Sequence, residues 1–235
     1  MNKNKLVSVI MSTYNSEKYI SKAIESILKQ SYKNFEFLII DDNSTDKTLE
    51  IIQKFENLDK RIRSYKNLTN LGLTKSLNKA IALSQGNFIA RQDDDDISYE
   101  KRLESQIKYV TKFNYDVCFS RARIIKNNQL IPKFSCYLPN KVVVNYKNPF
   151  IHGTLIIKKN ILNKMGNYNE KFYYSQDYYL FKKLILNNVK IKYIKKPLYF
   201  LNTENNISSQ FSNEQKFYSE CVKKDIDPED ELNKV

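Results

Sequence analysis

Residues 7–15 of the chain read VSVIMSTYN, and residues 37–46 read FLIIDDNSTD. Each stretch begins as an apolar run rich in β-branched residues and ends in polar residues, which is typical of a buried strand that leads into a loop. Apolar residues at helical spacing follow each stretch, at 19–28 and at 49–55. This alternation of strand and helix predicts an α/β chain with a mostly parallel, doubly wound sheet.

The alternation continues to about residue 121 and then breaks down. Further strands are predicted at 62–65, 88–90 and 117–120, and helices around 73–81 and 103–110. Prolines interrupt the stretch that follows, at 132, 139 and 149. In this back part we expect a hairpin tip at Asn127-Asn128, a strand at 150–157, a helix at 178–186, and late strands at 190–194 and 198–201.

Length and composition indicate one soluble domain. The chain has 235 residues, 41% of them hydrophobic, which is enough to build a core and excludes disorder as a description of the whole. Mean hydropathy is −0.58, and no apolar run approaches the ~20 residues that a membrane-spanning helix needs. The N-terminus lacks the apolar region of a signal peptide, and three scattered cysteines fit neither a disulfide framework nor a zinc site. We expect a reduced, cytoplasmic location.

The net charge of +13 is concentrated in the second half of the chain. Residues 1–100 hold 15 basic and 14 acidic residues, a balance of +1, whereas residues 101–235 hold 24 and 12, a balance of +12. Such a surplus favours polyanions, namely a membrane face, a phosphorylated acceptor or nucleic acid. Compositional drift is the alternative explanation. Within the same half, residues 211–218 read as an amphipathic element that could contact a partner or a membrane.

Polar loops follow three of the predicted strands, at residues 12–17, 41–46 and 91–96. In an open α/β sheet, ligands bind beyond the carboxyl ends of the strands, so these loops are expected to converge on one site. The chain contains neither G-x-G-x-x-G nor G-x-x-x-x-G-K-[ST], which argues against a Rossmann dinucleotide site and a P-loop.

The third loop carries four consecutive aspartates, Asp93 to Asp96. Like charges this close raise one another's pKa unless a cation neutralises them, and oxygen ligands of this kind suit Mg²⁺ or Mn²⁺. The alternative is a solvated acidic turn that caps the following helix. The position directly after a buried strand favours the metal.

Five strings in this order resemble the family 2 glycosyltransferases, and the resemblance covers about residues 5–205. They are residues 7–15, residues 39–46, Asn70-Leu71-Gly72-Leu73, Asp93-x-Asp95 with Arg102-Leu103 after it, and Ser175-Gln176-Asp177. The resemblance implies a GT-A fold and inverting transfer from a nucleoside-diphosphate sugar, often one linked to UDP. It also implies a transferase domain at 1–205, made of a nucleotide-sugar half (1–121) and an acceptor half (122–205), with an extension at 206–235.

The same resemblance implies a role for individual residues. Asp42 would hydrogen-bond the base, Asp95 would hold Mn²⁺ or Mg²⁺ on the diphosphate, and Asp177 would be the general base on the acceptor hydroxyl. The nucleotide pocket would be completed by Thr13, Tyr14, Asn15, Glu17, Asp93 and Asp94. These roles suit the chemistry, because a metal ion stabilises charge on a diphosphate leaving group and a sugar hydroxyl needs a base to take its proton.

Two departures from the family pattern stand out. The base motif, often Glu-Asp in the family, here reads Gln176-Asp177, so Gln176 becomes an acceptor contact. The late element that carries Arg and His in the family reads Tyr199-Phe200-Leu201-Asn202 here. Weaker candidates for contact with the acceptor or the diphosphate are His152, Arg91 and Lys75.

The leading hypothesis is transfer of a sugar to a glycan or a lipid-linked glycan in cell-surface polysaccharide synthesis. Transfer to a polyprenyl phosphate, with a peripheral position on the inner face of a membrane, is the enzymatic alternative. A nucleic-acid-binding module is disfavoured because the sequence has no helix-turn-helix, zinc or aromatic RNP pattern. A non-catalytic binder of polyanions or sugar nucleotides is the last alternative.

Overall fold

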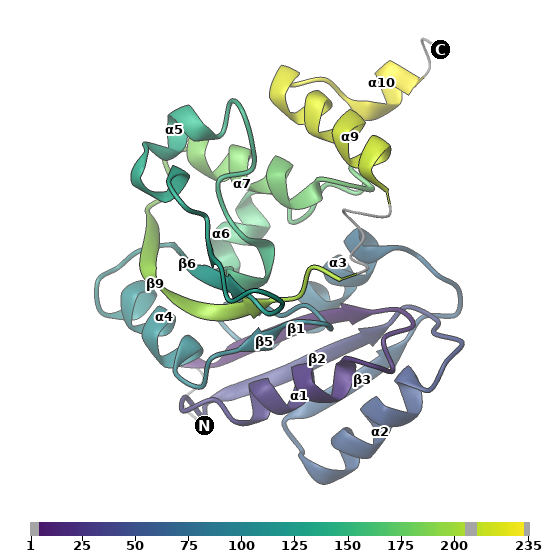
Figure 1. Cartoon of the computed structure of the whole chain (residues 1–235). Helices are drawn as coiled ribbons and strands as arrows, with labels where there is room; N and C mark the ends of the chain where they lie inside the picture. Colours follow the sequence, from purple (N-terminus) through teal and green to yellow (C-terminus); the bar gives the residue numbers. More distant parts are fainter. Residues whose placement is uncertain (1–4, 205–210, 233–235) are drawn as a thin grey trace.

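A curled sheet forms the centre of the computed structural model, which describes residues 5–204 and 211–232 (Figure 1). Its strands are β1 (Val7–Thr13), β2 (Phe35–Asp41), β3 (Ile62–Lys66), β4 (Phe88–Arg91), β5 (Ile97–Ser98), β6 (Val117–Ile124), β7 (Leu130–Ile131), β8 (Ile156–Lys158) and β9 (Ile191–Leu201). They run in the order β3-β2-β1-β4-β8-β6-β9-β5, and β7 pairs with β6. The strands from β3 to β4 are parallel to one another, whereas β8 is antiparallel to both β4 and β6. The predicted α/β fold, with a mostly parallel sheet and an antiparallel part toward the back half, is confirmed.

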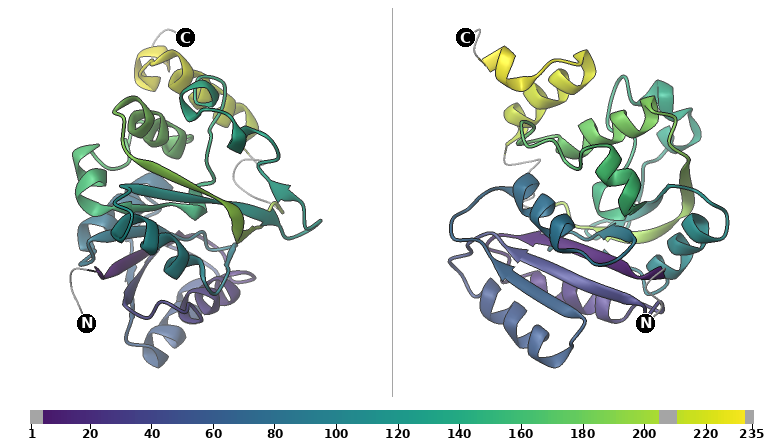
Figure 2. Two further views of the ribbon diagram at one scale, coloured as in Figure 1. Left: turned by 90° about the vertical axis from the view of Figure 1, so that its left-hand side faces the viewer. Right: turned by 180° about the vertical axis from the view of Figure 1, so that it is seen from behind.

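Helices cover both faces of this sheet, as Figure 2 shows from two further sides. They are α1 (Ile20–Leu28), α2 (Thr48–Leu58), α3 (Leu73–Leu83), α4 (Arg102–Thr111), α5 (Asn140–Val143), α6 (Lys159–Lys164), α7 (Gln176–Leu186), α9 (Ser212–Lys224) and α10 (Pro228–Leu232), with short 3₁₀ helices η2 (Ser135–Tyr137) and η3 (His152–Thr154). Helices α1 and α2 lie on one side of the parallel strands, and α3 lies on the other.

The alternation of side chains along β1 explains the two cores. Val7, Val9 and Met11 pack with residues of α1, α2 and α4, whereas Ile10 packs with residues of α3, α6, α7 and α9. Successive residues of a strand point to opposite faces, so one apolar run serves two layers. Full burial of each aliphatic side chain contributes about 1.5–3 kcal/mol to folding.

Three predicted strands in the back half are wrong in extent. Only Ile156–Lys158 forms a strand in the stretch predicted at 150–157, because η3 turns the chain immediately before it. The late strands predicted at 190–194 and 198–201 form one strand, β9, whose pairing with β6 shifts register near Ser120 and Arg121. That irregularity lets a strand that contains Pro197 continue through it.

The C-terminal helix α9 packs on α7. Cys221 and Val222 are buried in the same core cluster as Leu184 of α7. The buried Lys182 ammonium donates to the carbonyl of Val222 at 2.7 Å and pairs with Asp225 at 2.8 Å, so a cation lies at the carboxyl end of α9, where the helix dipole favours it. Of the element expected at 211–218, Phe217 and Tyr218 pack against this core, whereas Phe211 is 40% exposed. Across 5–204 and 211–232, no helix is both long enough and apolar enough to cross a membrane.

Candidate functional site

The parallel strands bring the three polar loops together, as predicted. Thr13 at the end of β1 lies beside Asp41 at the end of β2, and the backbone N–H of Asp42 donates to the carbonyl of Thr13 at 2.8 Å. On the other side of β1, the Thr13 hydroxyl donates to Asp94 Oδ2 at 2.6 Å. The ends of β1, β2 and β4 thus form one edge, and Thr13 joins the two carboxylate-bearing loops.

Hydrogen bonds tie the loop after β1 to the loop after β2. Asn15 adopts a left-handed conformation (φ 52°), in which its N–H donates to Ser44 Oγ and its side-chain carbonyl accepts from Thr45 N. The Glu17 carboxylate accepts from Lys47 N, and Tyr14 is half exposed beside this junction in sequence. Asn tolerates the left-handed region, which allows the tight turn. Asn15 and Glu17, two of the predicted pocket residues, therefore hold these two loops together.

Asp42 is buried and holds the loop that precedes α3. Its Oδ1 accepts from the Asn67 amide at 2.7 Å and from Leu71 N at 2.9 Å, and its Oδ2 accepts from Gly72 N at 2.8 Å. Gly72 has φ +85°, and a Cβ there would stand 2.9 Å from the Tyr173 ring. A glycine is therefore required for the close approach of this loop to the back half of the chain.

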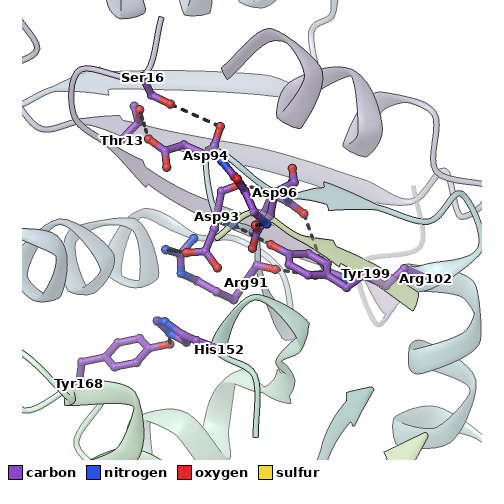
Figure 3. A network of polar contacts seen from close by, with 12 residues as sticks. Thr13, Ser16, Arg91, Asp93, Asp94, Asp96, Arg102, His152, Tyr168 and Tyr199 are labelled. Atoms are coloured by element: carbon purple, nitrogen blue, oxygen red, sulfur yellow. Dashed lines mark hydrogen bonds and ion pairs between the residues drawn. The ribbon is translucent and has the colours of Figure 1, made fainter. Parts of the chain in front are cut away.

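Residues of β4 and of the C-terminal end of β9 hold the acidic loop by hydrogen bonds (Figure 3). Asp93 Oδ1 accepts from the buried Arg91 guanidinium at 2.6 Å, and Asp93 N donates to the Tyr199 hydroxyl at 3.0 Å. Asp96 Oδ1 accepts from Asn202 N at 2.6 Å. The Arg102 guanidinium lies 5.1 Å from the centre of the Tyr199 ring. Tyr199 and Asn202, in the stretch that lacks the family's Arg and His, thus position the aspartates.

Three carboxylic acids of this loop are weaker than usual. Burial raises the pKa of Asp94 and of Asp96, and burial together with Asp93 and Asp94 raises the pKa of Asp95 to about 7. Positive charge from Arg91 lowers the pKa of Asp94 and of Asp95 but does not offset these effects. Added positive charge beside Asp95 would favour its ionised form.

The back half places His152 against Tyr168, and the charge of Asp177 acts on the pKa of both. His152 Nε2 lies 2.7 Å from the Tyr168 hydroxyl, and in Figure 3 Arg91 lies between Asp93 and this pair. Burial, followed by the charge of Arg91, lowers the pKa of His152, while the charges of Asp177 and Asp93 oppose that change. His152 is therefore neutral and lies near carboxylates from both halves of the chain.

Asp177 is oriented at the start of α7. Its Oδ2 accepts from the Asn148 amide at 2.7 Å and its Oδ1 from Tyr178 N at 2.8 Å. Ser175, the residue before α7, has φ 56° and its hydroxyl contacts Gln215 of α9. Gln176 is buried at the first helical position. Asp177 is therefore held in the first turn of α7 by hydrogen bonds to both of its carboxylate oxygens.

Two of the weaker candidates lie in different surroundings. Lys75 is exposed on the first turn of α3, whereas Arg91 is buried, and its Nε and Nη1 have no hydrogen-bond partner in the part of the chain that the structure describes. Residues that sequence reasoning missed are Tyr168, Tyr199, Asn202 and Asn148. No sequence pattern identifies them, because each one acts on a residue distant in the chain.

Replacing Gly153 by Ala is expected to destabilise the protein and to weaken the acidic loop. A Cβ at this position would overlap the hydroxyl of the buried Tyr199 and would stand 2.6 Å from Asp93 Oδ2. Overpacking of this kind costs about 1–3 kcal/mol. Chemical denaturation measures the loss, and a thermal-shift titration with UDP measures the effect on the site.

Gly166→Ala is the matched control. Gly166 has φ +81°, and the nearest atom that its Cβ would meet, Lys183 Nζ, lies 3.9 Å away, so this variant strains the backbone without crowding the site. It should lose stability and keep nucleotide binding. Equal nucleotide binding in both variants would contradict the predicted coupling of Gly153 to the acidic loop.

Comparison with solved structures identifies the class of fold. The Staphylococcus aureus protein TarS in complex with UDP-GlcNAc superposes with a TM-score of 0.74 at 26% identity, over 87% of this chain and 60% of that chain. A mannosyltransferase of Pyrobaculum calidifontis, solved with GDP-Man and Mn²⁺, superposes with a TM-score of 0.73 at 16% identity, over 90% of this chain and 61% of that one. The chain therefore spans less than two thirds of these structures, and it has the GT-A transferase fold.

The chain belongs to glycosyl transferase family 2, whose profile matches residues 8–188. An uncharacterized glycosyltransferase of Methanocaldococcus jannaschii is 37% identical over 91% of this chain and 77% of its own length. The Escherichia coli protein named UDP-Glc:alpha-D-GlcNAc-diphosphoundecaprenol beta-1,3-glucosyltransferase WfgD is 36% identical over 78% of this chain and 71% of its own length. The predicted family and the predicted enzyme class are confirmed.

Proposed function

We propose that this glycosyltransferase transfers a sugar from a UDP-sugar donor with inversion of configuration at the anomeric carbon. A divalent metal would assist the reaction, and Asp177 would be the general base. The observation that carries the proposal is the contact of the back half with the acidic loop beside His152. A Cβ on Gly153 would stand 2.6 Å from Asp93 Oδ2, and the charges of both Asp93 and Asp177 act on His152. One carboxylate comes from the acidic loop and the other from α7, so the two halves of the chain contribute to one site. Such a pair can hold a diphosphate leaving group and activate an acceptor.

Uridine is the proposed nucleoside. TarS, which resembles this chain at 25% identity or more, has been solved with UDP and with UDP-GlcNAc. Tyr14, Asn15 and Glu17 are exposed at the strand edge and would line the pocket. Asp42 Oδ2 accepts one hydrogen bond within the protein and retains a lone pair, which suits an N–H of the base. Thr13, Asp93 and Asp94 would support the ribose side of the pocket.

The acidic loop fits a divalent metal. Oxygen donors suit Mn²⁺ and Mg²⁺, and the raised pKa of Asp95, about 7, supports a cation beside it. Within the described residues, no three His, Cys, Asp or Glu side chains are grouped to hold a metal by themselves. Asp95 and the donor phosphates would share the ion. When bound, the ion would stabilise negative charge on the diphosphate.

Asp177 is the proposed base because its carboxylate is oriented and lies near the same site. The Asn148 amide and Tyr178 N each occupy one of its oxygens, which leaves lone pairs for an acceptor hydroxyl. In-line attack on the face opposite the departing diphosphate inverts the configuration at the anomeric carbon, as in inverting glycosidases. Gln176, Lys75 and Arg91 remain weaker proposals for contact with acceptor or diphosphate.

A glycan of the cell surface is the proposed acceptor. One relative, 32% identical, is named O-antigen biosynthesis glycosyltransferase WbnJ, and the name of WfgD includes a diphosphoundecaprenol-linked sugar. A lipid-linked glycan is therefore the acceptor class that we assign to this chain, together with a place on the inner face of the membrane.

A thermal-shift panel tests the donor assignment. Nucleotides and sugar nucleotides are each added with Mn²⁺, Mg²⁺ or EDTA. A ligand at 100 times its Kd stabilises the folded state by about 2.7 kcal/mol, which is readily measured. We expect metal-dependent stabilisation by UDP and by one UDP-sugar. The absence of a shift with every nucleotide would refute the pocket and favour a non-catalytic binder.

A further inference from the structure

The structure points to a membrane-contact surface on the segment 133–147, which includes η2 and α5. We propose that this segment lies against an anionic lipid bilayer and that its aromatic side chains enter the headgroup region. The evidence for this surface is the exposure and charge of its residues and is independent of catalysis. Its role in bringing a lipid-linked acceptor to the site rests on the proposed function.

Large apolar side chains are concentrated and exposed on this segment. The exposed fractions are 80% for Phe134, 58% for Tyr137, 55% for Leu138, 51% for Val142 and 73% for Tyr146. Five such residues within thirteen positions exceed the scattered exposure that is normal on a soluble surface. The segment lies at the upper left of Figure 1, at the edge of the molecule.

Charge on the segment favours lipid over protein as the partner. Residues 117–169 contain no Asp or Glu and nine Lys or Arg, and three of these, Lys133, Lys141 and Lys147, lie within the segment itself. The ammonium of Lys195, from the neighbouring β9, lies 4.4 Å from the centre of the Tyr137 ring. Lysine is depleted in protein interfaces, whereas lysine interleaved with aromatic residues is typical of surfaces that contact anionic bilayers.

The segment is packed against the rest of the protein through buried residues at its α5 end. Val143 and Val144 are buried, and the Tyr178 hydroxyl donates to the carbonyl of Val144 at 2.7 Å. The exposed side chains of α5 are therefore presented on a fixed base. A preorganised surface loses little conformational entropy when it docks.

The same anchor connects the surface to the proposed base. Tyr146 and Lys147 directly precede Asn148, whose amide holds the Asp177 carboxylate at 2.7 Å. A bilayer against the segment would consequently lie close to Asp177. This position would present the hydroxyl of a lipid-linked glycan to the site without a membrane-spanning helix.

Co-sedimentation of the full chain with vesicles tests the proposal. We expect binding to vesicles of equal phosphatidylcholine and phosphatidylglycerol, weak binding to phosphatidylcholine alone, and loss of binding at high salt. Reversing Lys133, Lys141 and Lys147 to Glu should lower the affinity by at least roughly 100-fold, from about fivefold for each lysine. Phe134→Ser combined with Tyr146→Ser should lower it by about tenfold or more.

Matched controls lie on α1, on α2 and on nearby loops. The apolar control combines Leu58→Ser with Leu68→Ser, at positions that are 82% and 97% exposed. The charge control replaces three exposed lysines of the front half, Lys22, Lys54 and Lys60, by Glu. Both controls should bind vesicles like the wild type. Three outcomes would each overturn the proposal. They are an equal loss of vesicle binding in the controls, equal binding to neutral and to anionic vesicles, and a dimer of the chain that the Phe134/Tyr146 variant dissociates.

Nucleotide binding separates this proposal from the proposed function. The variants of the segment should retain the thermal shift with UDP, since none of the changed residues lies in the nucleotide pocket. Vesicle binding without any UDP shift would refute the proposed UDP pocket and support the surface. A UDP shift with no vesicle binding would refute the surface alone.

Discussion

Replacing Asp177 by Asn is expected to reduce sugar transfer by about 10²-fold or more while donor affinity stays near the wild-type value. The amide cannot accept the proton of the acceptor hydroxyl, but it fills the same space beside Asn148. The donor pocket is built from other elements, so the change falls on the chemical step. Initial rates and a donor titration on the same preparation measure the two effects.

Asp230→Asn serves as the control, because Asp230 is an exposed acid in the first turn of α10. Loss of a helix N-terminal charge costs only about 0.3–1 kcal/mol, so both variants should fold. The control should retain full activity. An Asp177→Asn variant that is also fully active would remove Asp177 from the role of base.

Replacing Asp95 by Asn is expected to abolish the metal-dependent part of donor binding. Burial and the charges of Asp93 and Asp94 raise the pKa of Asp95 to about 7, and a bound cation would favour its ionised form. A neutral amide needs no such cation and binds it weakly. Thermal shifts with UDP, in Mn²⁺ and in EDTA, should become equal in the variant.

Asp96→Asn distinguishes a metal ligand from a structural carboxylate in the same loop. Asp96 is buried and accepts from Asn202 N at 2.6 Å, so this variant should lose stability and keep the difference between Mn²⁺ and EDTA. If Asp95→Asn retains that difference as well, Asp95 does not hold the metal.

Local patterns predicted the front half of the fold well. From β1 to β6 each apolar run became a strand and each helically spaced run became a helix, because burial of a single run decides both its conformation and its packing face. The back half was predicted less well. There η3 shortens the strand expected at 150–157, and a register shift joins two expected strands into β9, both of which depend on the neighbouring strands.

The sequence also predicted which loops would meet, since carboxyl ends of parallel strands share an edge. Thr13 and Asp94, 81 positions apart, accordingly form a hydrogen bond. It did not predict that Tyr199 and Asn202 would hold the acidic loop, or that Asn148 would orient Asp177. Those contacts follow from how β9 and α7 are placed, which no short-range pattern encodes.

By itself, the sequence determined the strand–helix order, the polar strand-end loops, the acidic run and the resemblance to family 2. Each of these depends on residues that are adjacent or regularly spaced along the chain. Only the tertiary structure decided that burial raises the pKa of Asp94, Asp95 and Asp96, that the charges of Asp93 and Asp177 act on the same histidine, and that segment 133–147 leaves its aromatic residues exposed. Burial and the distance between remote side chains are properties of packing, so they exist only once the chain has folded.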